Sequence, residues 1–343
     1  MNSEIHPQIR QLFQSADSFL IVSHIRPDGD AVGSLLGLGL ALQEIGKKVQ
    51  MVLVDGVPAS FRHLPGASQI TRKLKADYDA AIVVDASDLQ RTGGVLIDRI
   101  PDLNIDHHIT NLKFARINFV APEVEATAAV LAENLQNWGL QINEPVAKAL
   151  LTGVVSDTIG FRTSNVRSRT LRLAADLMDK GANLSELYNR ALTRRSYEAA
   201  RFWGKGLERL QRENRLVWTT LTLIDRQKSS YPGNDDADLV NILASIDEND
   251  ISVIFVEQKD NHVKVSWRAQ TGWDVSQLAL GFGGGGHPAA SGADIIGPLS
   301  EVQEKVLSAT RQLIQMGPAE KNKFFGNPRG EPPDLGVLHG KSH

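Results

Sequence analysis

The 343-residue sequence predicts an α/β protein of two domains. Apolar strands alternate with helical segments in the first half of the chain, a polar helical stretch follows, and a second set of strands and helices comes after it. We assign residues 1–183 to a doubly wound, mostly parallel sheet, 184–212 to a helical linker and 213–316 to a smaller α/β domain. Residues 317–343, rich in Gly, Pro, Lys and Asn, are predicted to be disordered.

In the first domain, apolar runs predict buried parallel strands at 19–22, 48–54, 78–84 and 103–105. Helical periodicity predicts helices at 35–42, 126–138, 145–155 and 167–179. Pro145 suits the first turn of its helix, and Gly181 suits a C-terminal cap.

In the second domain, residues 215–224 are typical of a strand. A hairpin is expected at 251–268, because Lys259-Asp260-Asn261 separates two strand-like runs. Helices are expected at 238–246, 275–282 and 299–316. The charged residues of the 184–212 stretch are interpreted as a solvated helix face.

Composition restricts the functions that the chain can have. A net charge of −3, from 37 basic and 40 acidic residues, argues against a large basic surface that binds long duplex nucleic acid. The absence of cysteine excludes disulfides and thiolate metal sites. No signal peptide is evident, and the longest apolar-rich run, 31–42, is too short to span a membrane. We therefore expect a cytoplasmic protein without membrane contact.

The stretch that follows the first predicted strand holds His24, Asp28 and Asp30. Open α/β sheets bind ligands at the carboxyl ends of their strands, and an imidazole with two carboxylates suits a divalent ion such as Mn, Fe or Zn. Asp-Gly-Asp after a proline is also typical of an ordinary turn, so this stretch alone leaves both interpretations open.

Further acidic and imidazole side chains follow other predicted elements: Asp85, the run Asp106-His107-His108, and Asp157. We take all of them as strand ends, which a parallel sheet gathers along one edge. Asp85 and Asp157 could separately be helix caps. Together the residues match two divalent ions about 3.5–4 Å apart that share a carboxylate. Gly33 and Ser34 are then expected to be small because their helix begins close to the ions and substrate.

A glycine run, Gly283 to Gly286, precedes His287-Pro288 in the second domain. Consecutive glycines allow backbone N–H groups to converge on a phosphate, although a flexible linker is the alternative. Arg268, on the preceding strand, is a candidate fork for a terminal phosphate, or else a surface ion-pair residue.

The motifs in their order resemble those of a known family. His24-x3-Asp28-x-Asp30-x2-Gly33-Ser34, Asp85, Asp106-His107-His108 and Asp157 resemble the four motifs of the DHH phosphoesterases. Gly284-Gly285-Gly286-His287, with Ala289-Ala290-Ser291-Gly292, resembles the DHH-associated domain of nanoRNases. The resemblance spans roughly residues 13–315.

The resemblance implies two bound divalent ions, of manganese. Residues matching one ion's ligands are His24, Asp28 and Asp85, and those matching the other's are Asp30, Asp85, His107 and Asp157. His108 would face the scissile phosphate, and Asp106 would orient the histidine pair. Arg268, Gly284, Gly285, Gly286 and His287 would bind substrate, which is expected to lie between the two domains.

The implied activity is hydrolysis of very short RNA oligonucleotides to nucleoside 5′-monophosphates by a water bridging two ions, together with dephosphorylation of adenosine 3′,5′-bisphosphate (pAp). The alternative is a phosphodiesterase for linear dinucleotides from cyclic dinucleotide signalling. A pyrophosphatase, a processive single-strand exonuclease and a non-catalytic nucleotide sensor fit the sequence less well. The resemblance also makes a homodimer an option.

Overall fold

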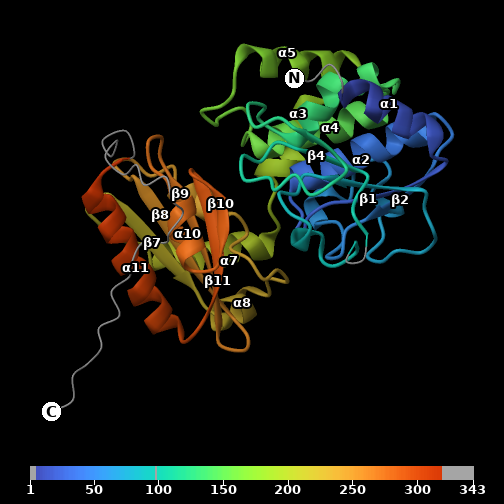
Figure 1. Cartoon of the computed structure of the whole chain (residues 1–343). Helices are drawn as coiled ribbons and strands as arrows, with labels where there is room; N and C mark the ends of the chain where they lie inside the picture. The colour runs from blue at the N-terminus through green and yellow to red at the C-terminus, as the bar shows by residue number, and fades with distance from the viewer. Residues whose placement is uncertain (1–4, 97–98, 319–343) are drawn as a thin grey trace. The chain divides into compact units, whose positions relative to one another are not determined.

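The computed structural model describes residues 5–96 and 99–318. The chain divides into two compact units, with the boundary between Arg194 and Arg195 (Figure 1). The predicted two-domain α/β fold is confirmed. The predicted disordered tail, 317–343, lies outside the described residues except for its first two positions. Among the described helices, none combines the length and apolar character that a membrane crossing requires.

The first unit contains a five-stranded parallel sheet with the strand order β2-β1-β3-β4-β5. Its strands are β1 (Ser18–Val22), β2 (Lys48–Val52), β3 (Ala80–Val84), β4 (Leu103–Asp106) and β5 (Ile117–Val120). The first four lie where the apolar runs predicted them. The edge strand β5 was not predicted, because its partly buried sequence does not form a continuous apolar run.

Five α-helices accompany this sheet: α1 (Ile5–Ser15), α2 (Gly29–Glu44), α3 (Thr127–Asn134), α4 (Glu144–Asp157) and α5 (Ser168–Asp179). They pack with one face of the sheet in a single large core, and Figure 1 shows α3 and α4 together over the strands. Helix α1 was not predicted. Short 3₁₀ segments are η1 (Ala59–Phe61), η2 (Ala67–Gln69), η3 (Gln90–Thr92) and η4 (Gln136–Trp138).

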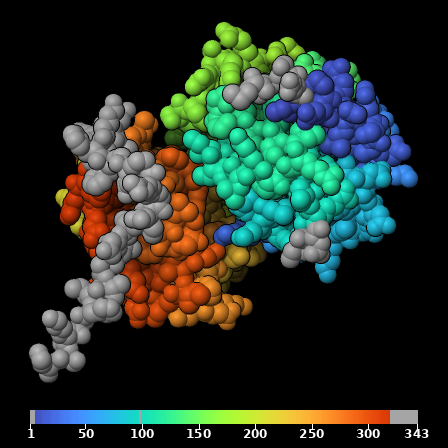
Figure 2. Space-filling model, in the orientation of Figure 1, coloured from blue at the N-terminus to red at the C-terminus, as the bar shows by residue number. Residues whose placement is uncertain are grey.

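The other face of the sheet is also buried, but by the segments that follow β3 rather than by α-helices. Leu20, Val22 and Val83 pack there with Ala86 and Leu96. Much of the visible face of this unit is formed by the part of the chain around β4 and β5, coloured teal in Figure 2. Covering both faces explains why the strands are nearly continuous apolar runs.

Helices α2 and α4 run antiparallel and touch through their backbones. A Cβ atom at Gly33 would overlap the backbone of α4 at Ala149 and Gly153. A Cβ at Gly29 would overlap the side chain of Ser156, near the end of α4. Helix packing therefore gives Gly33 a reason to be small besides the expected closeness of the ions and substrate, and it brings the start of α2 to the end of α4.

The 184–212 stretch, predicted to be a linker, contains α6 (Leu184–Tyr188), a π-helical turn η5 (Asn189–Thr193), α7 (Tyr197–Glu208) and the start of β6. Leu187 and Ala191 belong to the core of the first unit, whereas Phe202 belongs to a core of the second. The unit boundary therefore falls inside this stretch.

The second unit contains a six-stranded mixed sheet in the order β10-β11-β9-β8-β7-β6, in which only the β7–β8 pair is parallel among the described strands. The strands are β6 (Gln211–Glu213), β7 (Leu216–Leu221), β8 (Ile251–Gln258), β9 (His262–Ala269), β10 (Gly285–His287) and β11 (Ala290–Ile296). The predicted hairpin is β8–β9. The glycine run was not expected to form a strand, yet half of it lies in β10.

Helices cover both faces of this second sheet. One core joins the strands to α10 (Ser276–Gly281) and α11 (Leu299–Met316), the long red helix in Figure 1. The opposite core includes Phe202 of α7 and the apolar residues of α9 (Leu239–Leu243). Helix α8 (Leu223–Ser229) follows β7.

The contact between α2 and α4 predicts that one added methyl group at this contact lowers the stability of the protein. Gly33→Ala is expected to lower the free energy of unfolding by about 1–3 kcal/mol, because the helices must separate. Urea denaturation measures this change. Gly204→Ala in α7 is the matched control, since a Cβ there meets no atom of the described residues within 4 Å. The control should be neutral or up to about 1 kcal/mol more stable. Equal stability of both variants would contradict the packing argument.

Candidate metal centre

Acidic and imidazole side chains gather at the carboxyl end of the parallel sheet. The strand order places β2 on one side of β1 and β3 on the other, so the neighbouring ends of β1 and β3 form a topological switch point. His24 lies just beyond β1, and Asp85 follows β3 directly. The fold therefore brings the two residues together although 60 positions of sequence separate them.

A first group consists of His24, Asp28 and Asp85, whose ligand atoms lie within 4.8 Å of one another. Nε2 of His24 is 3.5 Å from Oδ2 of Asp85 and 3.9 Å from Oδ1 of Asp28. Nδ1 of His24 is 2.8 Å from the carbonyl oxygen of Ile25. Because a carbonyl only accepts hydrogen bonds, we assign the proton to Nδ1, which leaves the lone pair of Nε2 directed at the carboxylates.

A second group consists of Asp30, Asp85 and His107, and its ligand atoms satisfy the same 4.8 Å limit. Nε2 of His107 lies 4.0 Å from Oδ2 of Asp30 and 3.9 Å from Oδ1 of Asp85. Asp157 joins this group, with Oδ2 also 3.9 Å from Nε2 of His107. Nδ1 of His107 is 3.2 Å from the carbonyl of Val124, which fixes the same tautomer as in His24.

Asp85 is the member that the two groups share. Its Oδ2 faces His24 and its Oδ1 faces His107, so each oxygen belongs to a different group. The residue adopts a left-handed backbone conformation, with φ of +56°. Nearby amides hold it there: Asn104 and Asn111 both donate to the carbonyl of the next residue, Ala86. A strained backbone at such a position is typical of functional sites.

The carboxylate of Asp30 is almost completely buried, at 1% exposure, and is hydrogen-bonded on both oxygens. The first two amides of α3 donate to it, from Thr127 at 2.7 Å and from Ala128 at 2.9 Å. The hydroxyl of Ser34 donates to Oδ1 at 3.2 Å. The N-cap of α3 is Ala126, which has no acceptor in its side chain, so Asp30 performs the capping for this helix.

The carboxylates of the two groups lie close enough for their negative charges to repel one another. Burial and the negative charges of Asp85 and Asp157 raise the pKa of Asp30 well above its ordinary value. Loss of hydration and the charges of Asp28 and Asp85 do the same to the pKa of Asp157. Burial opposes ionisation of Asp85 too, but His24 and the other imidazoles lower its pKa. Carboxylates crowded in this way beside imidazole rings form a donor set that could hold divalent metal.

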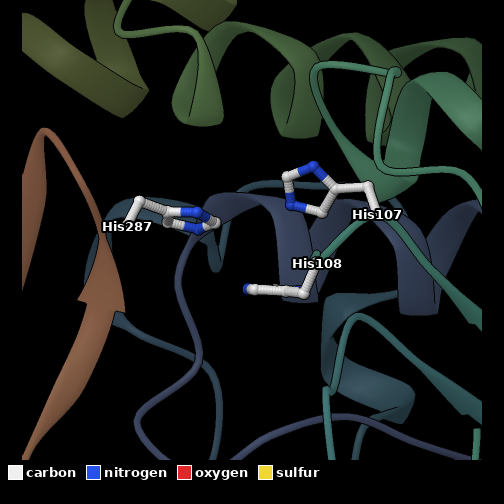
Figure 3. Close-up of side chains that lie close together, drawn as sticks. All are labelled: His107, His108 and His287. Atoms are coloured by element: carbon white, nitrogen blue, oxygen red, sulfur yellow. The ribbon is translucent and has the colours of Figure 1, made fainter. Parts of the chain in front are cut away.

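His108 differs from the other two histidines. Its ring stands beside that of His107, with centroids 4.7 Å apart (Figure 3), but its Nδ1 is 2.7 Å from Oδ1 of Asp106. Burial would lower the pKa of His108, yet the hydrogen bond to Asp106 and the charges of Asp85 and Asp106 raise it to about 9. His108 is therefore suited to donate hydrogen bonds rather than to ligate metal.

Asp106 is fully buried and accepts three hydrogen bonds. The backbone amide of His107 and the ring of His108 donate to Oδ1, and the side chain of Asn111 donates to Oδ2 at 2.6 Å. Asn111 also donates to Oδ1 of Asn104 at 2.8 Å. This network fixes the position of the loop that carries both histidines.

Two family models match this chain. The model of the DHH family N-terminal domain matches residues 18–154, and that of the DHHA1 domain matches residues 222–316. The bifunctional oligoribonuclease and PAP phosphatase NrnA of Thermus thermophilus is 32% identical over 297 residues, which cover 86% of this chain and 89% of that protein. The chain belongs to the DHH family. The predicted resemblance is thus confirmed, and with it the prediction that the chain is an enzyme, a phosphoesterase.

Further relatives support the assignment of this chain to the DHH family. Proteins of the same name from Mycoplasma pneumoniae and Bacillus subtilis are 29% and 26% identical, over 89% and 81% of this chain and 99% and 90% of their own lengths. An exopolyphosphatase-related protein from Bacteroides fragilis has a TM-score of 0.80 at 26% identity, over 90% of this chain and 96% of that chain. RecJ from Thermus thermophilus, with a TM-score of 0.53, 12% identity and coverage of 91% and 55%, shares the fold.

The structure corrects the placement of one predicted residue in this DHH protein. Asp157 is the last residue of α4 and not a strand end. It reaches the other residues because α4 ends where α2 begins. Three residues with positive φ follow closely: Ile159, Gly160 and Phe161. The backbone amide of Phe161 donates to the hydroxyl of Thr158, which itself donates to the carbonyl of Val154.

In the second unit, Arg268 lies on β9 and is partly buried. Its Nε donates to Oδ1 of Asn241 and its Nη1 to the carbonyl of Trp267, both at 2.9 Å. It is thus held by neighbours and is not a surface ion-pair residue. Loss of hydration lowers its pKa, partly offset by the charges of Asp236 and Asp238.

The glycine run serves the local fold as well. The amides of Gly283 and Gly284 donate to the carbonyls of Leu280 and Ala279, at the end of α10. They are therefore not available to bind a phosphate in this conformation. Gly285 and Gly286 lie in β10, at the edge of the sheet, and His287 ends this strand (Figure 3).

Several residues around the groups were not predicted from the sequence. The most central is Thr127, whose amide binds Asp30 and whose hydroxyl donates to Oδ1 of Asp85 at 3.0 Å. The available signal was a single hydroxyl residue within the apolar run Ala126 to Ala132. Asn104 and Asn111 had a comparable signal, since each interrupts or follows a buried strand.

The shared position of Asp85 predicts how divalent cations bind. Asp85→Asn is expected to weaken Mn²⁺ binding by more than about 100-fold, because partners outside the ligand set alone account for 10–100-fold in metal sites. Isothermal titration measures the affinity. The control is Asp102→Asn, another buried aspartate, which pairs with Arg99 and Arg116. Unchanged Mn²⁺ affinity of Asp85→Asn would rule out a shared ligand.

Proposed function

We propose that this chain is a Mn²⁺-dependent phosphohydrolase that cleaves very short RNA oligonucleotides to nucleoside 5′-monophosphates and removes the 3′-phosphate of pAp. The observation that carries the proposal is the pair of His/Asp groups sharing Asp85, each group facing a different oxygen of that residue. The substrates are inferred from the relatives, several of which are named as oligoribonucleases and PAP phosphatases.

One ion would be held by His24, Asp28 and Asp85, and the other by Asp30, Asp85, His107 and Asp157. Bound divalent ions lower the pKa of a coordinated water and neutralise charge on the phosphoryl group. The tautomers of His24 and His107 support these roles, since carbonyl contacts leave Nε2 of each ring as the acceptor. Manganese fits a set of carboxylate and imidazole donors without sulfur.

His108 would donate a hydrogen bond to a phosphoryl oxygen or to the leaving group. The contact with Asp106 keeps Nδ1 occupied and directs the rest of the ring away from that carboxylate. Asp106 in turn is held by Asn111, so the ring is oriented before substrate binds. Such preorganised donors stabilise charge that develops in the transition state.

Arg268, Gly284, Gly285, Gly286 and His287 are proposed to bind the end of the substrate that is not cleaved. Asn241 and the carbonyl of Trp267 occupy two of the five donors of Arg268, which leaves others for a phosphate. The role of Gly284 would be steric, because its own amide caps α10 and a Cβ there would overlap the backbone of β11.

A second candidate substrate class is linear dinucleotides from cyclic dinucleotide signalling. The cyclic-di-AMP phosphodiesterase GdpP of Bacillus subtilis is 22% identical over 343 aligned residues, which cover 90% of this chain and 50% of that protein. Ions held by the same His/Asp groups could serve the hydrolysis of either substrate class. The cytoplasmic location and the homodimer expected from the sequence stay predictions.

An assay of product release distinguishes these substrates. With Mn²⁺, the protein should release nucleoside monophosphate from a labelled ribodinucleotide faster than from a pentamer or longer RNA, and phosphate from pAp. Linear pApA tests the second candidate. Binding of these compounds without any product would instead identify a nucleotide sensor.

His108→Asn is expected to lower kcat by about 100–1000-fold while leaving Mn²⁺ affinity within a few-fold, as for removal of one transition-state donor. His262→Asn, at the start of β9, is the matched control and should keep full activity. An equal loss in both variants would argue against a catalytic role for His108.

Arg268→Lys tests the substrate-binding proposal. Because lysine cannot reproduce the planar fork, KM for pAp should rise about tenfold with little change in kcat, as expected for lost uniform binding. Arg212→Lys, an exposed residue paired with Glu248, is the control. A fall in kcat with unchanged KM would assign Arg268 a different role.

A further inference from the structure

We propose that Thr127 is a positioning residue that sets the orientation of the Asp85 carboxylate between the two His/Asp groups. The inference rests on the proposed metal centre, and it concerns a residue outside the ligand set. Thr127 is the first residue of α3 and is completely buried.

The hydroxyl of Thr127 lies 3.0 Å from Oδ1 of Asp85. A carboxylate can only accept, so the hydroxyl is the donor. Oδ1 is also the oxygen that lies 3.9 Å from Nε2 of His107. The hydrogen bond therefore holds this oxygen on the side of the second group, and Oδ2 remains 3.5 Å from Nε2 of His24.

Without this hydrogen bond, the carboxylate would lose its fixed rotation. The terminal torsion of aspartate is broad, and intrinsic preferences do not hold it at one angle. The charge of Asp85 also interacts unfavourably with the carboxyl groups of Asp30 and Asp157, so these neighbours do not hold it in place. The hydroxyl of Thr127 counteracts this rotation, so that each group retains one oxygen of Asp85.

The same residue contacts Asp30 through its backbone. The amide of Thr127 donates to Oδ2 of Asp30 at 2.7 Å. This second hydrogen bond does not depend on the side chain, so a substitution at position 127 removes only the contact with Asp85. The two contacts can therefore be separated by mutation, and the capping of α3 by Asp30 is preserved.

The test compares Thr127→Val, which has nearly the same shape but no hydroxyl, with Thr127→Ser, which keeps the hydroxyl. Isothermal titration with Mn²⁺ and the Mn²⁺ electron paramagnetic resonance spectrum are measured on the full chain. Thr127→Val should lower Mn²⁺ affinity by about 10–100-fold and weaken the coupling between two bound ions, whereas Thr127→Ser should remain within about threefold of the unmodified protein.

Thr152→Val is the matched control. Thr152 is equally buried, but its hydroxyl donates only to the carbonyl of Lys148, within α4, among the described contacts. This variant should bind Mn²⁺ as the unmodified protein does. In Thr127→Val, hydrolysis should recover at high Mn²⁺ concentration with KM for the substrate unchanged, which a general loss of structure would not produce.

Circular dichroism checks the fold of each variant. If Thr127→Val does not fold, Thr127→Ala is compared with Thr127→Ser in the same way. Unchanged Mn²⁺ affinity in the variants without hydroxyl, or equal losses in Thr127→Ser, would overturn the proposal. If the unmodified protein binds Mn²⁺ but cleaves none of the substrates, the proposed function fails while the affinities of the variants still decide the role of Thr127. If it binds no Mn²⁺, both proposals fail.

Discussion

The hydrogen bonds from α3 to the carboxylate of Asp30 connect the candidate metal centre to the fold. They join residues 97 and 98 positions apart in the sequence and hold a buried acidic group at the carboxyl end of the parallel sheet. Two amides at the positive end of a helix offset part of the cost of that burial. The helix in turn has no side-chain acceptor at its own N-cap. The site and the helical layer therefore depend on the same contact.

Close packing of α2 against α4 is the second requirement. Glycines on these helices let the backbones touch, so the first turn of α2 and the last residue of α4 contribute carboxylates to the same place. Larger side chains would separate Asp157 from Asp30. The packing of apolar helices thus decides the spacing of the polar residues beyond them.

Residues that follow strands directly were predictable from the sequence. His24, Asp85 and His107 come after buried apolar runs, and the parallel sheet brings their positions together without detailed knowledge of loops. Asp157 was selected from the sequence but assigned to a strand end rather than a helix end, since its position depends on how two helices pack. Thr127 gave little signal because one hydroxyl in an apolar run is usual in helices. The glycine run predicted backbone amides that converge on a phosphate. Only the fold shows that the amides of Gly283 and Gly284 instead cap α10.

The left-handed backbone of Asp85 places a required carboxylate in a conformation that aspartate rarely adopts. Asparagine and glycine adopt positive φ more readily than aspartate, and neither would add negative charge beside Asp30 and Asp157. In a copy of this chain released from selection for activity, asparagine or glycine at this position would relieve the backbone strain and give up the charge that His24 and the other imidazoles stabilise. Among related sequences, a change at this position would be an early sign that a chain has kept the fold and given up the chemistry.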